Sequence, residues 1–173
     1  MPITMQQILA RLDTDEPEYA ALAALGPEAI PHLKVLVRSD DPGIASKAAY
    51  LATLIESDES ADVIEAASAS PQETVRVAAA AGMRNLTAAK AAPWIERLLD
   101  DSDPGVRKQA LQTVGALRLS LDPRVKKIAT SDPEKELRQI AKDVQRVSRG
   151  APADSTKKTP RKTKATKSKT RKK

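Results

Sequence analysis

The chain of 173 residues contains no cysteine and no phenylalanine, and its only aromatic side chains are one tryptophan and two tyrosines. Without cysteine, disulfide bonds and thiolate metal ligands are excluded. An interior with so few aromatic residues must be built from Leu, Ile, Val and Ala. Alanine is abundant among these, and its small side chain lets helices pack closely together.

The chain also lacks a long apolar run. No stretch approaches the roughly 18–20 residues that span a bilayer, and the N-terminal residues lack the basic and apolar regions of a signal peptide. We therefore expect no membrane contact and a cytoplasmic location.

The usual signatures of catalysis are scarce. His32 is the sole histidine, and no Gly-rich phosphate loop occurs. The acidic clusters all fall beside predicted turns between helices, where Asp caps a helix start. We expect His32 to be a partly buried packing residue, and we predict that the chain is not an enzyme and uses no cofactor or metal.

What the chain does have is an internal repeat. Ile44, Val75, Val106 and Leu137 lie 31 residues apart, and an alanine follows each of them by four residues. A constant interval of about 20–50 residues is typical of a stacked array, in which each unit buries its apolar face against its neighbours.

Each repeat predicts two helices joined by a tight turn, because apolar residues recur at helical spacing on both sides of a break that contains proline. The predicted pairs are 28–38 with 42–56, 60–69 with 72–86, 88–100 with 104–118, and 122–130 with 134–149, after an irregular leading pair at 3–12 and 16–25. We therefore predict an all-α fold in which residues 1–149 form an α-solenoid of about five antiparallel helix pairs.

Two segments carry a family resemblance: Leu25-Gly-Pro-Glu-Ala-Ile-Pro-His-Leu33 and Asp103-Pro-Gly-Val-Arg-Lys-Gln-Ala-Leu111 look like HEAT repeats. The resemblance covers about residues 25–149. It implies a ladder between repeats, made by an Asp in each turn and an Arg in each second helix. The Arg positions are Arg76, Arg107 and Arg138, and the matching acidic positions hold Asp41, Gln72, Asp103 and Glu134. Only the 103/107 rung fits fully. A phosphate-binding row of arginines is the alternative interpretation.

The concave face of the array is predicted from helix geometry. Where 44, 48, 52 and 55 are buried, 46, 50 and 53 lie on the opposite side, and the 31-residue period carries these positions through the array. The predicted contact residues on or near this face are Tyr50, Arg84, Lys108, Gln112, Lys142 and Arg146.

The C-terminal segment 150–173 is strongly basic. It has only Asp154 to offset ten cations, so its charge is about +9, against about −3 for residues 1–150. We predict a disordered tail that binds nucleic acid without sequence preference, because no residue in it can build a core or stack a base. A solubilising or membrane-directed tail is the alternative. The cations are Lys157, Lys158, Arg161, Lys162, Lys164, Lys167, Lys169, Arg171, Lys172 and Lys173.

These features predict a monomeric binding scaffold whose concave face docks a protein while its tail holds DNA or RNA. Association with the nucleoid is the alternative to a free cytoplasmic location. The alternative is a nucleic-acid-binding protein that grips one duplex with array and tail together. The architecture also looks similar to HEAT-like DNA glycosylases, but only Tyr50 supplies an aromatic ring on the predicted face. It resembles the HEAT-like phycobilin lyases as well, for which the array looks short.

Overall fold

The computed structural model describes residues 3–148. These residues form ten α-helices and two short 3-10 helices, with no strand among them. The predicted all-α solenoid of five helix pairs is confirmed over this range. The helices are α1 (Met5–Leu12), α2 (Tyr19–Ala23), α3 (Ile30–Leu36), α4 (Pro42–Ala52), α5 (Ser60–Ser68), α6 (Glu73–Gly82), α7 (Ala88–Leu98), α8 (Pro104–Leu117), α9 (Asp122–Ser131) and α10 (Lys135–Ser148), with η1 (Gly26–Ala29) before α3 and η2 (Met83–Asn85) after α6.

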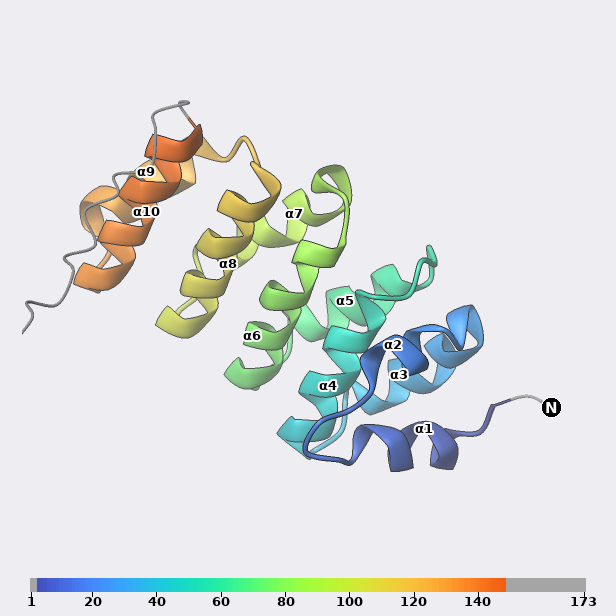
Figure 1. Cartoon of the computed structure of the whole chain (residues 1–173). Coiled ribbons are helices and arrows are strands. Elements are labelled where there is room, and N and C mark those ends of the chain that lie inside the picture. Colours follow the sequence, from blue (N-terminus) through green and yellow to red (C-terminus); the bar gives the residue numbers. More distant parts are fainter. Residues whose placement is uncertain (1–2, 149–173) are drawn as a thin grey trace, which may run out of the picture.

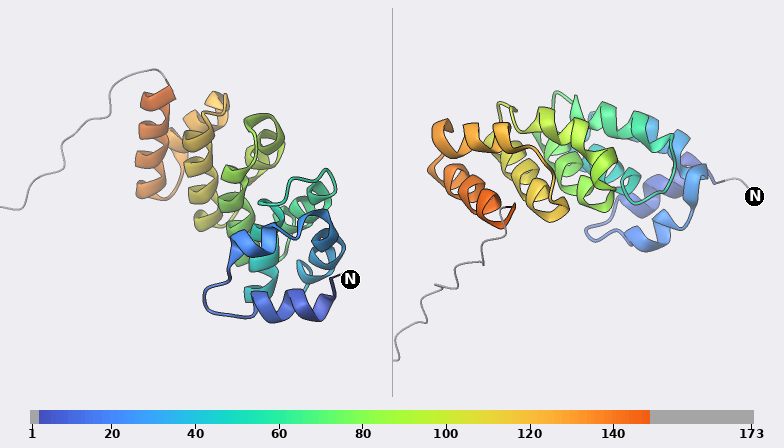
Figure 2. Two further views of the ribbon diagram at one scale, coloured as in Figure 1. Left: turned by 45° about the vertical axis from the view of Figure 1, so that its right-hand side comes forward. Right: turned by 90° about the horizontal axis from the view of Figure 1, so that it is seen from above.

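The helix pairs stack side by side into an elongated array (Figure 1). The second helices of the last four pairs, α4, α6, α8 and α10, form one layer, and α3, α5, α7 and α9 form the other (Figure 2). The basic tail and its ten predicted nucleic-acid contacts lie outside the described residues.

The core follows the 31-residue period. Ala48, Ala79, Ala110 and Ala141 are all buried, as are the four apolar residues that precede them by four positions. In the last repeat the apolar stripe leaves the core, and Val147 is 47% exposed. A terminal repeat has no following neighbour to cover it, which accounts for this change.

The helix starts follow from local chemistry. The Asp41 carboxylate accepts hydrogen bonds from the backbone N–H groups of Gly43 and Ile44, and that of Asp103 accepts one from Val106. Pro42 and Pro104 occupy the first position of α4 and α8, where a missing N–H costs nothing. These contacts give each turn a defined geometry.

The leading pair differs from the repeats that follow. Helices α1 and α2 are short and both contact α4. The Tyr19 ring packs edge-on against Tyr50, with 4.9 Å between the ring centroids. His32 is half-buried, as predicted, and its Nε2 lies 3.0 Å from the Ile3 carbonyl oxygen. The pair thus closes the N-terminal side of the array.

No helix within residues 3–148 is long and apolar enough to cross a membrane. The same residues contain no cluster of three or more His, Asp or Glu side chains suited to hold a metal ion.

Candidate functional site

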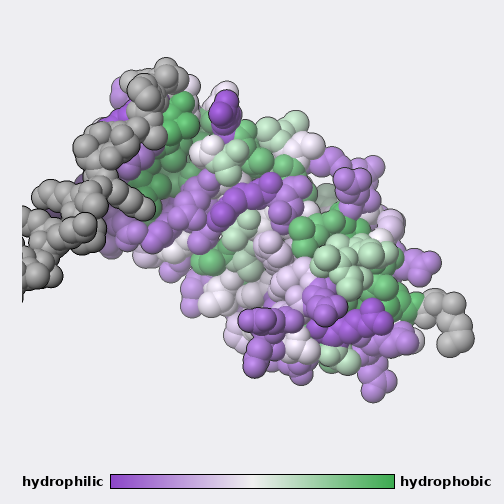
Figure 3. Space-filling model, viewed as in Figure 1, coloured by the Kyte–Doolittle hydropathy of each residue, from purple (hydrophilic) through white to green (hydrophobic). Residues whose placement is uncertain are grey.

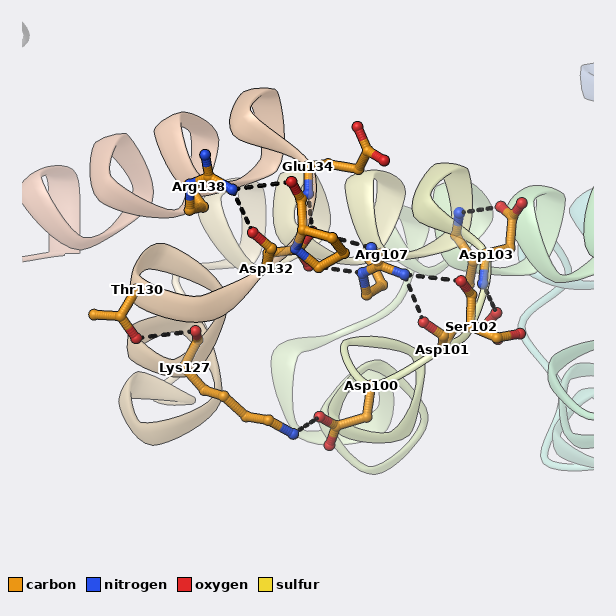
Figure 4. A network of polar contacts seen from close by, with 12 residues as sticks. Asp100, Asp101, Ser102, Asp103, Arg107, Lys127, Thr130, Asp132, Glu134 and Arg138 are labelled. Atoms are coloured by element: carbon orange, nitrogen blue, oxygen red, sulfur yellow. Dashed lines mark hydrogen bonds and ion pairs between the residues drawn. The ribbon is translucent and has the colours of Figure 1, made fainter.

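The arginine row forms a ladder between repeats (Figure 4). Arg107 on α8 bridges to Asp132 in the next turn through two hydrogen bonds of 2.8 and 3.0 Å. Its Nη1 also donates to the carbonyl oxygens of Asp101 and Ser102 in its own turn, both at 2.9 Å. Arg76 repeats this pattern with Asp101 and with the carbonyls of Ser70 and Pro71. Among the described residues, Arg138 bonds only the carbonyls of Asp132 and Pro133. The contacts of Arg76 and Arg107 thus favour a structural ladder over a phosphate-binding row.

The structure corrects which acids the ladder uses. The sequence places the acidic column at Asp103 and Glu134, but Asp103 caps α8, and the arginines pair with Asp101 and Asp132. These two aspartates also accept a backbone N–H two residues further on, from Asp103 and Glu134. Each of these hydrogen bonds closes an Asx turn that fixes the carboxylate of Asp101 or Asp132. The rung is therefore formed by the aspartate two positions before the predicted acid.

The rung carboxylates remain ionised despite their burial. The side chains of Arg107 and Asp132 are only 10% and 4% exposed. Burial of Asp132 opposes ionisation, but the hydrogen bonds from Arg107 and from the Glu134 backbone outweigh it, so its pKa lies below the usual value. The pKa of Asp101 is lowered in the same way by Arg76.

The layer of α4, α6, α8 and α10 carries the predicted concave-face residues, and we call its exposed side the second-helix face. Hydrophilic side chains run across this face among nearly neutral and apolar ones (Figure 3). At its centre, Val77, Ala78 and Ala81 of α6 are half-buried. The predicted neighbour Thr53 is not on the surface: it is buried and donates to the Tyr50 carbonyl. Tyr50 itself is half-buried against Tyr19, which limits how much of its ring a partner reaches.

Arg84 is the most organised side chain on the second-helix face. It extends from η2 to α8, where Nη2 donates to Gln109 Oε1 at 2.5 Å and to Gln112 Oε1 at 3.3 Å. Its Nε lies 3.4 Å from Thr113 Oγ1. All three acceptors are neutral, and within residues 3–148 no carboxylate forms an ion pair with Arg84. The structure thus brings the predicted residues Arg84 and Gln112 together. No carboxylate among the described residues neutralises the charge of Arg84.

The other predicted cations have different surroundings. Lys108 forms an ion pair with Glu136 of α10 at 2.6 Å, and Arg146 lies 3.9 Å from Asp143. Lys142 takes the position that Ala49, Ala80 and Leu111 hold in the preceding repeats, all of them buried against the next unit. We therefore assign Lys142 to the end of the array and not to the second-helix face.

One cavity lies away from these residues. It measures about 480 Å³ and is lined by the 53–58 linker after α4, the 85–87 segment before α7, and side chains that include Ile64, Lys90 and Trp94. The Trp94 indole N–H donates to Glu65 at 2.7 Å. The repeat pattern in the sequence did not reveal this cavity. The signal was the 53–59 linker, which is longer than the other connections between repeats.

A comparison with protein families gives the array its family. The model of the HEAT family, described as HEAT repeats, matches residues 60–144. The chain is a HEAT-repeat protein. The matched segment spans α5 to α10 and includes both complete rungs of the ladder, so the resemblance in the sequence is confirmed.

The fold of this HEAT-repeat protein is similar to that of a chain in the complex of CpcE and CpcF of phycocyanin lyase from Nostoc sp. PCC7120. The TM-score is 0.66 at 22% sequence identity, and the match covers 82% of this chain and 97% of the other. In a sequence comparison, no curated protein matches.

This structural match corrects two expectations. The prediction that the chain is not an enzyme is contradicted, because a chain of the same fold belongs to a lyase complex. The array is also not too short for that class of protein, since it spans almost the whole matched chain.

Proposed function

We propose that this HEAT-repeat protein binds a partner protein through its second-helix face, with Arg84 as the central contact. Arg84 carries the proposal because it is exposed, held in place by Gln109 and Gln112, and without a carboxylate partner in the described array. Binding surfaces are enriched in arginine, because its planar guanidinium group donates several hydrogen bonds at once.

The partner group expected at Arg84 is a carboxylate. An arginine held by neutral amides keeps its full charge, and a carboxylate can replace one or both Gln contacts with a bidentate, charge-assisted pair. Beside it, the small side chains of Val77, Ala78 and Ala81 allow a close approach of the partner's backbone or apolar side chains. The surface thus fits an acidic segment with apolar neighbours.

Site-specific photocrosslinking tests the face. A photoreactive phenylalanine replaces Gln139, which is exposed on α10, or Val35, which is 60% exposed on α3 in the opposite layer. In extracts of the source cells, the proposal expects a discrete adduct from position 139 that Arg84→Glu abolishes, and none from position 35. Equal adducts from both positions, insensitive to Arg84→Glu, would contradict it.

The basic segment supports a second contact, with nucleic acid. Its ten cations are accompanied by a single acid, and neutralising phosphates releases counterions, so binding should weaken steeply as salt rises. The test compares the full chain with a variant in which the ten cations are replaced by Gln, on labelled duplex DNA and RNA from about 50 to 200 mM salt. Loss of binding in the variant supports the segment as the anchor.

The same assay separates the rival in which array and tail grip one duplex. Replacing Arg84, Lys108, Lys142 and Arg146 with Ala should then lower both the affinity and the salt slope. If the array docks protein, these four changes leave nucleic-acid binding almost unchanged. Binding that is absent for the full chain at low salt rejects both nucleic-acid proposals.

Action as part of a lyase is the second candidate, and the coverage of 97% of a chain from the phycocyanin lyase complex favours it. This candidate also requires a protein partner, so it is compatible with docking on the second-helix face. Incubating the chain with phycocyanin, alone and with a co-purified partner, tests it: a change in the visible absorption spectrum supports lyase action, and an unchanged spectrum with the identified partner rejects it.

A further inference from the structure

One rung of the arginine ladder is missing both of its members. Ala45 stands where the next three repeats have Arg76, Arg107 and Arg138, and Ser70 stands where the following turns have Asp101 and Asp132. The two replacements meet at one place, between the turn before α4 and the turn before α6. We call this place the vacant rung.

The vacant rung is a hollow. A cavity of about 330 Å³ is lined by residues 37–40 of one turn and 69–72 of the next, together with Ala66. At the filled rung of Arg107, the corresponding cavity is about 200 Å³, and Arg107 itself forms part of its lining. The space that an arginine occupies elsewhere in the ladder is thus open here.

The hollow keeps the acceptors that an arginine would bind. At the filled rungs, Arg Nη1 donates to two successive turn carbonyls, those of Ser70 and Pro71 or of Asp101 and Ser102. The equivalent carbonyls here belong to Ser39 and Asp40. Within residues 3–148, the Ser39 carbonyl accepts no hydrogen bond outside regular helix bonding, and that of Asp40 accepts only a long one of 3.5 Å from Gln72 Nε2.

Gln72 adds a further acceptor. Its Oε1 is fully buried and has no hydrogen-bond partner in the described part of the chain. A buried acceptor without a donor is destabilising, so a donor that reaches it is favoured. Asp40 also lines the hollow, and the one cation among its lining residues, Arg38, donates through Nη1 to the Lys34 carbonyl. The hollow is therefore lined by turn carbonyls and an amide oxygen whose hydrogen-bonding capacity is largely unused within the described residues.

We propose that the vacant rung binds the guanidinium group of an arginine supplied from outside the array. A guanidinium presents N–H donors in one plane at fixed angles, which suits two successive carbonyls and the Gln72 amide oxygen better than the single ammonium of lysine. The arginine comes either from a second protein or from this chain's own basic segment, which contains Arg161 and Arg171. This site is separate from the second-helix face and does not depend on the partner proposed there.

The test uses ethylguanidinium as the probe and nuclear magnetic resonance of the ¹⁵N-labelled full chain. We expect the amide signals of residues 39–41 and 70–72 to shift with a Kd on the order of 10 mM, as suits so small a ligand. Ethylammonium at the same concentration should shift them several-fold less. The corresponding amides at the filled rung, 101–103 and 132–134, serve as the internal control.

Two variants move the result in opposite directions. Ser70→Asp restores the carboxylate of the rung and should tighten ethylguanidinium binding about 10-fold, as expected for a charge-assisted pair. Ala45→Arg supplies the arginine within the chain and should abolish binding. Absence of shifts at these turns in both the parent chain and Ser70→Asp overturns the proposal. So do shifts that persist unchanged in a folded Ala45→Arg variant.

The source of the arginine is read from the double variant Arg161→Gln with Arg171→Gln. If the chain's own segment occupies the rung, the amides of residues 39–41 shift on this change and ethylguanidinium binds more tightly. If the spectrum and the affinity stay the same, the arginine belongs to a second protein. Either result supports the site, because each requires saturable binding at the vacant rung.

Discussion

At the scale of single residues, Arg76 and Arg107 each connect two successive turns of the array. Arg107 bonds the carbonyls of its own turn and the carboxylate of the next, so one side chain fixes the spacing between two repeats. Because this bridge is nearly excluded from water, loss of one partner leaves the other as an uncompensated buried charge. Exposed ion pairs between first helices, such as that of Glu65 with Arg97, are bathed in solvent and contribute little.

Replacing Asp132 with Asn should lower the free energy of unfolding at pH 7 by about 3 kcal/mol, because the change leaves the buried Arg107 charge uncompensated. The amide oxygen of Asn can still accept the Glu134 N–H, so the turn is retained. Urea denaturation measures the effect. The matched control, Glu65→Gln, removes the partner of Arg97 at a site where both side chains are about half exposed, and should cost less than about 1 kcal/mol.

The same pair predicts a pH dependence. The pKa of Asp132 is lowered in the folded state, so its contribution is complete above the unfolded value of about 3.9 and is lost as the pH falls through the folded value. The gap in stability between the parent chain and Asp132→Asn should therefore stay constant from pH 7 to about 5 and narrow below about 4. A gap that widens on acidification would rule out this assignment.

Arg118 provides a second test at this scale. It ends α8 in the left-handed conformation, with φ of 52°, where a side chain with a Cβ is disfavoured. Arg118→Gly should raise the free energy of unfolding by about 0.5–1 kcal/mol. Arg118→Ala keeps the Cβ and should give no such gain, so thermal unfolding of the two variants separates backbone strain from loss of the charged side chain.

At the scale of helices, close approach between neighbours depends on small residues. A Cβ placed on Gly82 of α6 would lie 2.7 Å from Thr53 Oγ1 and 2.9 Å from Thr53 Cγ2. Thr53 is buried and bonded to the Tyr50 carbonyl, so it cannot easily move aside. The contact between α4 and α6 therefore requires glycine at this position.

Gly82→Ala should accordingly destabilise the chain by about 1–3 kcal/mol. Gly115→Ala in α8 is the matched control, since its Cβ would meet only Val144 Cγ2 at 3.4 Å. There the higher helix propensity of alanine should leave stability unchanged or raise it by up to about 1 kcal/mol. Equal effects of the two substitutions in urea denaturation would show that spacing between α4 and α6 is not what Gly82 provides.

The helices themselves could be predicted from the sequence because the same pattern of apolar residues and turn prolines recurs in each repeat. The apolar interval of 31 residues and the prolines at the turns were enough to locate the last four pairs, and the irregular leading pair lies outside the period. The ladder was only half predictable: the arginines are periodic, but which acid each one meets depends on an Asx turn that spacing does not show. The cavity beside Trp94 arises where one linker departs from the period, so a repeat template could not reveal it.

At the scale of the whole molecule, we propose two distinct contact surfaces on the array. The second-helix face presents Arg84, held by α8. The vacant rung lies between the turns that precede α4 and α6. Both have hydrogen-bonding groups already positioned by neighbouring repeats, which reduces the ordering that binding requires. A stacked array thus builds its contact sites from pairs of repeats, and a change in one repeat alters only the site it shares.

The central claim is that a partner docks on the second-helix face through Arg84. Its most direct test is the dissociation constant of the partner captured by crosslinking at position 139, measured for the parent chain, Arg84→Gln and Arg97→Gln. Arg97 is an equivalent surface arginine on α7, in the opposite layer. The account predicts at least a 10-fold loss of affinity for Arg84→Gln, about 1.4 kcal/mol, and less than a twofold change for Arg97→Gln. Equal affinities for Arg84→Gln and the parent chain would contradict it.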